Sequence, residues 1–151
     1  MTTDNDLAAA ASAHHKRRAI GWLVGFWLLL VSLTHVPSPF PKVGEPDHFD
    51  KVVHFSLYGT LGLLALHALT VRAANSAAMV RCVGIFAAVT AFGLFDEATQ
   101  PLTGRDFDWF DWLADGVGVL AGIALYEAVR RRRTLHATSK LSNKRWASET
   151  E

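Results

Sequence analysis

Four apolar segments, each long enough to cross a lipid bilayer, constrain the fold of this 151-residue chain more than any other feature. A helix rises about 1.5 Å per residue, so roughly 20 apolar residues span a hydrocarbon core of about 30 Å. A stretch such as GWLVGFWLLLVSL is apolar on every side, whereas a surface helix of a soluble bundle carries a polar face. The predicted spans are Ala19–Val36, Val52–Val71, Met79–Phe95 and Trp109–Val129.

The sequence therefore predicts an all-α fold, an integral membrane four-helix bundle. Residues 19–129 form the predicted transmembrane domain. Residues 1–18 and 130–151 are basic tails of small and polar residues, and we expect both to be largely disordered. The run Arg130–Arg133 suits an anchor to anionic lipids. Because no nucleic-acid-binding motif accompanies it, nucleic acid is not an expected partner.

The distribution of basic residues predicts an orientation in the membrane. Of the fifteen Lys and Arg residues, twelve fall on the side of the two termini and of the connection after Val71. Only Lys42, Lys51 and Arg105 fall on the other side. By the positive-inside rule both termini are cytoplasmic, and the loops Pro37–Lys51 and Pro101–Asp108 face outward. We expect a multi-pass protein of the bacterial inner (cytoplasmic) membrane.

Polar residues gather at the outward end of three predicted helices. Residues spaced three or four apart share one face of a helix, and this spacing recurs in each set. The second span carries Asp50, His54 and Tyr58, the third carries Asp96 and Gln100 with Glu97 beside them, and the fourth carries Asp108, Asp111 and Asp115. Charged side chains that face lipid are costly, so we expect these residues to face one another in a polar pocket, with Lys51 and Arg105 as the partner cations.

Glycines on two spans predict close packing of the helices. Gly59 and Gly62 lie on the second span, and Gly116, Gly118 and Gly122 lie on the fourth. Small residues at such spacing let transmembrane helices approach each other. Gly118 and Gly122 lie on the same face of the fourth span as Asp111 and Asp115.

The chain resembles the VanZ-like family of bacterial membrane proteins. The similarity lies in DKVVHFSLYGTLG, residues 50–62, and in DEATQPLTGRDFDWFDWLADGVG, residues 96–118. The resemblance implies a role at the outer face of the membrane, near cell-wall precursors, and a link to tolerance of glycopeptide antibiotics. It implies no agreed enzymatic activity and no cofactor. The family positions carried over are Asp50, Lys51, His54, Tyr58, Asp96, Glu97, Gln100, Arg105, Asp111 and Asp115, and many relatives have Asn in place of Asp115.

Two interpretations of the central polar residues stay open. His54 either ties two helices together as a neutral imidazole, or acts as a general base or a metal ligand. The carboxylates that could join it at a metal ion are Asp50, Asp96, Glu97 and Asp111, with His54, Asp96 and Asp111 as the named set. Arg105 either neutralises a nearby aspartate or grips a phosphate or carboxylate headgroup.

Three functions follow from these interpretations. The first is binding of membrane lipids, including a lipid-linked cell-wall precursor, or of a surface ligand. The second is a membrane enzyme that acts on a lipid phosphate through Asp and His chemistry; the sequence contains no recognisable nucleophile motif for it. The third is a proton- or cation-coupled transporter, which would need a homodimer because four helices are few. The clustering of acids at one end disfavours a continuous transport path.

Overall fold

The computed structural model describes residues 3–35, 48–72 and 77–149, and all regular structure in these ranges is helical. The predicted all-α fold is therefore confirmed. The elements are α1 (Asp4–His35), α2 (His48–Arg72), α3 (Ala78–Thr99), the short 3-10 helix η1 (Gln100–Thr103) and α4 (Trp109–Glu149). Four helices are long and apolar enough to cross a membrane, as the sequence predicted. Together they indicate a multi-pass membrane protein.

Helix extends into both segments in which the sequence predicted disorder. α1 begins at Asp4, where Thr3 and Asp6 bond reciprocally: the Thr3 N–H donates to Asp6 Oδ2 at 3.0 Å, and the Asp6 N–H donates to Thr3 Oγ1 at 3.3 Å. Such paired bonds satisfy free N–H groups at the start of a helix. At the other end, α4 continues to Glu149 through a stretch without Gly or Pro. The tails are helical and not disordered as predicted, because Ala, Leu, Lys and Arg favour helix even where the helix packs against no core.

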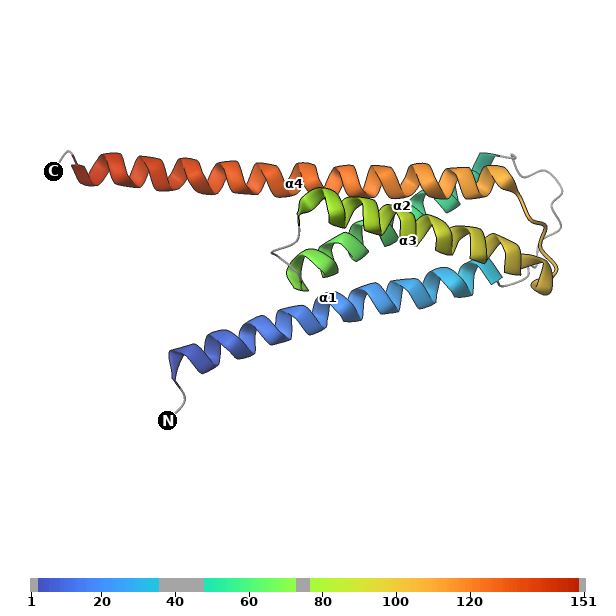
Figure 1. Cartoon of the computed structure of the whole chain (residues 1–151), viewed down its shortest axis with the longest axis horizontal. Coiled ribbons are helices and arrows are strands. Elements are labelled where there is room, and N and C mark those ends of the chain that lie inside the picture. Colours follow the sequence, from blue (N-terminus) through green and yellow to red (C-terminus); the bar gives the residue numbers. More distant parts are fainter. Residues whose placement is uncertain (1–2, 36–47, 73–76, 150–151) are drawn as a thin grey trace.

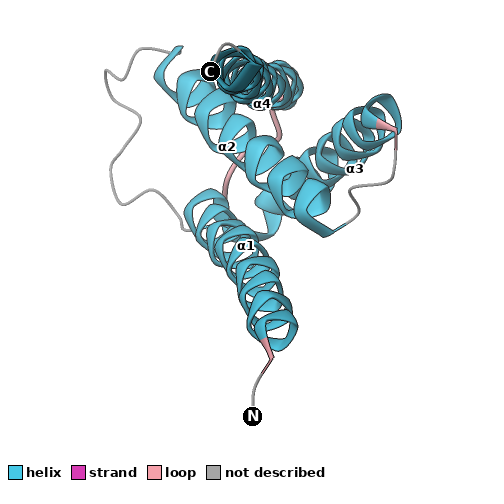
Figure 2. Cartoon of the chain, turned by 90° about the vertical axis from the view of Figure 1, so that its left-hand side faces the viewer, coloured by secondary structure: helices cyan, strands magenta, loops and turns pink. Residues whose placement is uncertain are grey.

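The four long helices alternate in direction, and α2 is the central one. Viewed from one end, α2 lies between the other three helices (Figure 2) and packs against each of them. The ends of α1 and α4 nearest the termini lie at the same end of the bundle, opposite η1 (Figure 1). This arrangement agrees with termini on one side of the membrane, and which side that is remains a prediction. Residues 36–47 of the predicted outward loop lie outside the described residues.

The structure shows that α2 and α4 are in direct contact at their glycines. A Cβ atom on Gly59 would lie 3.0 Å from the carbonyl oxygen of Gly118. A Cβ atom on Gly122 would overlap the carbonyl oxygen of Gly59. Because these neighbours are backbone atoms that cannot turn away, α2 and α4 approach this closely only where side chains are missing.

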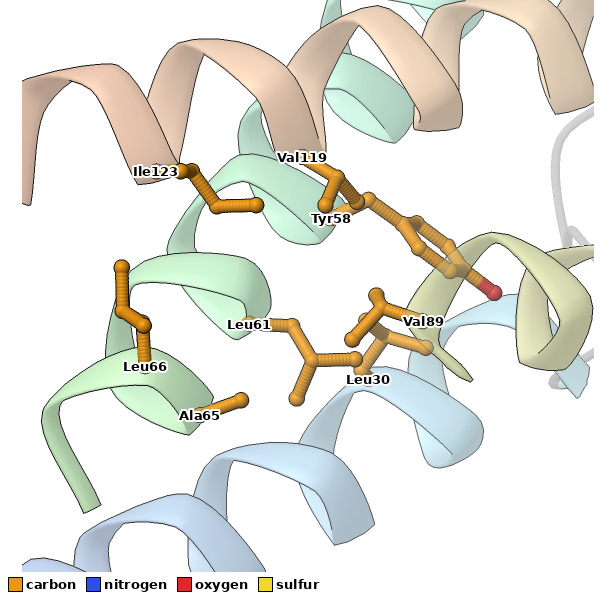
Figure 3. Packing of buried hydrophobic residues seen from close by; sticks show 8 residues of the cluster. All are labelled: Leu30, Tyr58, Leu61, Ala65, Leu66, Val89, Val119 and Ile123. Atoms are coloured by element: carbon orange, nitrogen blue, oxygen red, sulfur yellow. The ribbon is translucent and has the colours of Figure 1, made fainter. Parts of the chain in front are cut away.

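The apolar core lies in the middle of the bundle. It is formed by Leu30, Tyr58, Leu61, Ala65, Leu66, Val89, Val119 and Ile123 (Figure 3), which come from all four long helices. Tyr58 ends this cluster, with its hydroxyl group pointing away from the other labelled side chains (Figure 3). Many large apolar side chains outside the core are exposed, among them Trp22 and Val117, as expected for helices that face lipid. The core therefore gives way to a polar region beyond Tyr58.

Candidate functional site: a polar cluster at the η1 end of the bundle

Polar side chains from α2, α3, η1 and α4 are buried together next to the apolar core. The relative exposures are 2% for His54, 1% for Asp96, 0% for Glu97, 2% for Gln100, 6% for Asp111 and 0% for Asp115. Tyr58 is also fully buried. Burial of charged groups is costly unless each has a partner, so the contacts within this cluster decide what it can do.

His54 on α2 is the centre of the buried part. Its Nδ1 atom lies 3.0 Å from Oδ1 of Asp115 on α4 and 3.6 Å from Oε1 of Glu97 on α3. Glu97 Oε1 also accepts a hydrogen bond from Nε2 of Gln100 at 2.9 Å, and its Oε2 accepts one from the backbone N–H of Asp108 at 3.2 Å. One imidazole thus joins three helices through two carboxylates.

Lys51 forms an outer layer with two acids of the fourth span. Its ammonium nitrogen lies 3.0 Å from Oδ2 of Asp108 and 3.3 Å from Oδ1 of Asp111. Asp108 Oδ1 accepts a hydrogen bond from the backbone N–H of Phe110 at 2.8 Å, which caps the start of α4. This N–H and, after it, the ammonium group of Lys51 lower the pKa of Asp108 below its ordinary value. The predicted pairing of Lys51 with aspartates is present in the structure.

Arg105 reaches the cluster from the turn after η1. Gly104, with a φ of 79°, closes η1 in the left-handed conformation that suits glycine. The next residue, Arg105, places Nη2 3.5 Å from Oδ1 of Asp50. The Arg105 side chain is 23% exposed and that of Asp50 is 48% exposed. A partly exposed pair at this distance contributes little stability, so Arg105 lies at the rim, accessible from outside the bundle.

Two residues of α1 complete the cluster, and the sequence analysis did not identify them. Thr34 Oγ1 donates to Oδ1 of Asp96 at 3.0 Å. The Nδ1 atom of His35 lies 3.5 Å from the same oxygen, and its Nε2 atom lies 3.0 Å from Oγ1 of Thr99. The sequence did contain a signal for these two residues. Thr34 and His35 lie at the outward end of the first apolar segment, and Asp96 lies at the outward end of the third. Asp96 therefore faces α1 rather than His54.

Three buried oxygen atoms in this region have no hydrogen-bond partner within the described residues. They are the Tyr58 hydroxyl, Oδ2 of Asp96 and Oδ2 of Asp115. A Cβ atom on Gly93 would lie 3.0 Å from Asp115 Oδ2 and 3.1 Å from Cε1 of Tyr58, so two of these residues line the same space. An unpaired buried oxygen costs about 1–3 kcal/mol, and a group that supplies a proton, a water or a cation would remove that cost.

The geometry brings together two sets of three residues that offer metal-ligating atoms within 4.8 Å of one another. One set is Asp50, His54 and Asp111, and the other is His54, Glu97 and Asp115. Of the carboxylates predicted as possible partners of His54, Asp50, Glu97 and Asp111 each belong to one of these sets, and Asp96 belongs to neither. The reason is its engagement with Thr34 and His35 on α1.

An apolar groove runs beside the cluster, between α2 and α4. It has a volume of about 420 Å³ and is lined by Lys51, Val52, Phe55, Leu113, Ala114 and Val117. Val52, Leu113 and Val117 are more than half exposed, so the groove opens toward the surroundings of the bundle. Lys51 is the lining residue that also belongs to the polar cluster. We refer to this feature as the α2–α4 groove.

Comparison with known proteins gives one match. Residues 10–130, which include all of the polar cluster, match the VanZ/LLP1 family. Neither the curated proteins nor the solved structures contain a match to the chain. The match covers most of the chain and confirms the resemblance seen in the two sequence motifs. With four apolar helices and this match over residues 10–130, the chain is a member of the VanZ/LLP1 family.

Proposed function

We propose that the chain binds an anionic lipid of the bacterial cell envelope at the polar end of the bundle. The phosphate headgroup would lie at Lys51, and the apolar chain of the lipid would lie in the α2–α4 groove. The observation that carries this proposal is the position of Lys51, which lines the groove and also belongs to the polar cluster. The site thus offers a cation and an apolar channel to the same ligand.

The chemistry of the rim favours a phosphate group. Lys51 is 29% exposed, so its ammonium group is accessible even while it contacts Asp108 and Asp111. Arg105 supplies a guanidinium group at the same end of the bundle, and guanidinium matches the oxygen geometry of phosphate. Lys51 contacts Asp108 and Arg105 contacts Asp50, and both carboxylates are partly exposed. A phosphate headgroup can therefore replace these two ion pairs at a small cost in free energy.

The groove walls favour a flexible hydrocarbon chain. Its lining apart from Lys51 is apolar, and it is open along the face of α2 and α4 that the bilayer would cover. A lipid could therefore enter sideways from the membrane. The glycine contacts keep α2 and α4, the two helices that line the groove, close together.

The location follows from the charge bias of the sequence. With the Lys- and Arg-rich ends on the cytoplasmic side, the polar cluster would face outward from the bacterial inner membrane. Lipid-linked cell-wall precursors carry phosphate on a long apolar chain and are exposed at that face. Binding such a lipid would connect the chain to the antibiotic tolerance that the family resemblance implies.

The test measures lipid binding by purified protein. The wild-type chain in nanodiscs of phosphatidylcholine is titrated with a polyprenyl phosphate and, separately, with phosphatidylglycerol. Lys51→Gln should weaken binding of the polyprenyl phosphate by about 10-fold, which is the loss expected for one charge-assisted contact. Lys140→Gln removes an equal charge from the far end of α4 and should leave affinity unchanged.

A second variant tests the groove itself. Ala114→Trp would fill the groove without removing a charge and should also weaken binding. Equal affinity of wild type, Lys51→Gln and Ala114→Trp would overturn the proposal. Equal affinity of the wild type for both lipids would assign the site to general anionic lipid rather than to a cell-wall carrier.

An enzyme that acts on a lipid phosphate is the second candidate. It is favoured by the buried contact between His54 and Asp115 close to the groove, because a carboxylate that orients an imidazole is a common part of acid–base catalysis. The purified chain would be incubated with polyprenyl phosphates and diphosphates and checked for release of inorganic phosphate. Release that is lost in Asp111→Asn would support an enzyme, and no release from any of these lipids would reject it.

A further inference from the structure

The innermost carboxylates of the polar cluster lack sufficient positive charge. Lys51 is paired with Asp108 and Asp111, and Arg105 is paired with Asp50. Deeper in the bundle, Asp96, Glu97 and Asp115 are each at most 1% exposed. Within the part of the chain that the structure describes, the cationic groups within 4 Å of these three acids are the imidazoles of His35 and His54. Three buried carboxylates with two imidazoles are short of positive charge in either protonation state of the imidazoles.

We propose that His54, Glu97 and Asp115 bind one divalent transition-metal cation, with Zn²⁺ and Mn²⁺ as the fitting ions. The donor set is one imidazole nitrogen and two carboxylate oxygens, which suits these ions better than the all-oxygen sites of Ca²⁺ and Mg²⁺. Bound to Nδ1 of His54, the cation would take the place of a proton there, so binding releases one proton whenever this nitrogen is protonated. This proposal does not depend on lipid binding.

The spacing of the three donor atoms fits a metal ion. Zinc binds imidazole nitrogen and carboxylate oxygen at about 2.0–2.2 Å, which separates neighbouring ligands of a tetrahedral site by roughly 3.3–3.5 Å. Nδ1 of His54 lies 3.0 Å from Oδ1 of Asp115 and 3.6 Å from Oε1 of Glu97. These two separations lie on either side of the tetrahedral value, and the donor atoms of Glu97 and Asp115 lie within 4.8 Å of each other.

Unpartnered oxygen atoms give an independent reason to expect a ligand. Oδ2 of Asp115 belongs to one of the three ligating residues, is buried and has no hydrogen-bond partner. The Tyr58 hydroxyl is also unpartnered, and its ring stacks on the His54 ring with centroids 6.3 Å apart and planes 4° apart. An ion held by both oxygen atoms of Asp115 would satisfy Oδ2 as well as Oδ1, and a metal-bound water could satisfy the hydroxyl.

The surroundings of the three residues also resemble those of a metal site. Glu97 is held by the side chain of Gln100 and by the backbone N–H of Asp108, which fix the orientation of its carboxylate. The neighbouring set of Asp50, His54 and Asp111 shares His54 and is partly exposed through Asp50. It therefore offers ligands along a route from the rim to the buried site.

The experiment uses the full-length chain without an affinity tag, purified in detergent and stripped with a chelator. Zn²⁺ or Mn²⁺ is added, unbound metal is removed, and the bound metal is measured by mass spectrometry. We expect about one ion per chain and a rise in the thermal unfolding temperature that Mg²⁺ does not reproduce. Cobalt substitution should give the visible absorption of a tetrahedral site with nitrogen and oxygen ligands.

Two substitutions that keep the shape of the side chain and remove its charge test where the ion binds. Glu97→Gln and Asp115→Asn should each lower metal affinity by about 100-fold or more, because each removes a charged ligand. Glu127→Gln makes the same change of charge in α4 at the other end of the bundle, where Glu127 pairs with Arg130 at 2.8 Å, and should leave affinity unchanged. Absence of metal binding by the wild type would overturn the proposal. Binding that Asp111→Asn abolishes while Glu97→Gln does not would also overturn it, since the ion would then occupy the outer set.

Discussion

Gly118 on α4 packs directly against the backbone carbonyl of Phe55 on α2, so closely that a Cβ atom on Gly118 would overlap the Phe55 oxygen. Gly118 lies three residues after Asp115 and Phe55 follows His54, so this contact adjoins the one that holds His54 against Asp115. The backbone contact therefore fixes the separation of α2 and α4 beside the polar cluster. Side-chain rearrangement cannot relieve an overlap with a carbonyl group.

Gly118→Ala should destabilise the protein by about 1–3 kcal/mol, because the added methyl group forces α2 and α4 apart. Thermal unfolding in detergent, followed by circular dichroism, measures the change. Gly116→Ala is the matched control in the same helix. Its Cβ atom would meet only the Thr90 Cγ2 atom at 3.9 Å, so this substitution should be neutral or stabilise the helix by up to about 1 kcal/mol. Equal stability of the two variants would contradict the importance of the Gly118 contact.

Trp112 links α4 to α3 through a hydrogen bond from its Nε1 to the carbonyl oxygen of Thr90, at 3.1 Å. Trp112→Phe removes the donor and keeps an aromatic ring, so we expect a loss of about 1 kcal/mol of unfolding free energy. Chemical unfolding monitored by circular dichroism would report it. Trp109→Phe is the comparison, since Trp109 is 59% exposed and should tolerate the change. If Trp109→Phe lowered the free energy of unfolding more than Trp112→Phe, the hydrogen bond from Trp112 to Thr90 would be unimportant for stability.

Asp108 should make stability depend on pH in the acid range. Its pKa is lowered in the folded protein, first by the Phe110 N–H and then by Lys51, from an ordinary value of 3.8. A carboxylate with a lowered pKa stabilises the folded state above its ordinary pKa, and this contribution disappears as the pH falls through the folded pKa. Because the side chain is 38% exposed, the contribution at neutral pH should stay below about 1 kcal/mol.

Comparison of the wild type with Asp108→Asn isolates this contribution. Asn can still cap α4, so the variant removes the charge and keeps the hydrogen bond to Phe110. Thermal unfolding should show the wild type to be more stable at pH 7, with the difference shrinking below about pH 4 and disappearing once the pH is below the folded pKa of Asp108. A difference that stays constant across this range would argue against the ion pair with Lys51.

The apolar segments determined the four membrane-spanning helices, and the spacing of the polar residues indicated the part of the cluster that comes from α2, α3 and α4. Runs of apolar residues can be satisfied in lipid only as helices, so the class of fold followed from composition along the chain. The glycines of the second and fourth spans indicated close helix packing, because close approach of backbones requires small side chains. The structure shows that Gly59, Gly118 and Gly122 lie where α2 and α4 meet. Spacing by three or four residues placed His54 and Asp115 on faces that could meet.

Only the tertiary structure decided which carboxylate each cation meets. Asp96 and Glu97 are adjacent in the sequence, yet Asp96 turns toward Thr34 and His35 on α1 while Glu97 turns toward His54 on α2. Helical spacing fixes the face of a residue on its own helix and leaves open the rotation of that helix against its neighbours. That rotation is set by side-chain packing across all four helices, which no single segment of the sequence contains.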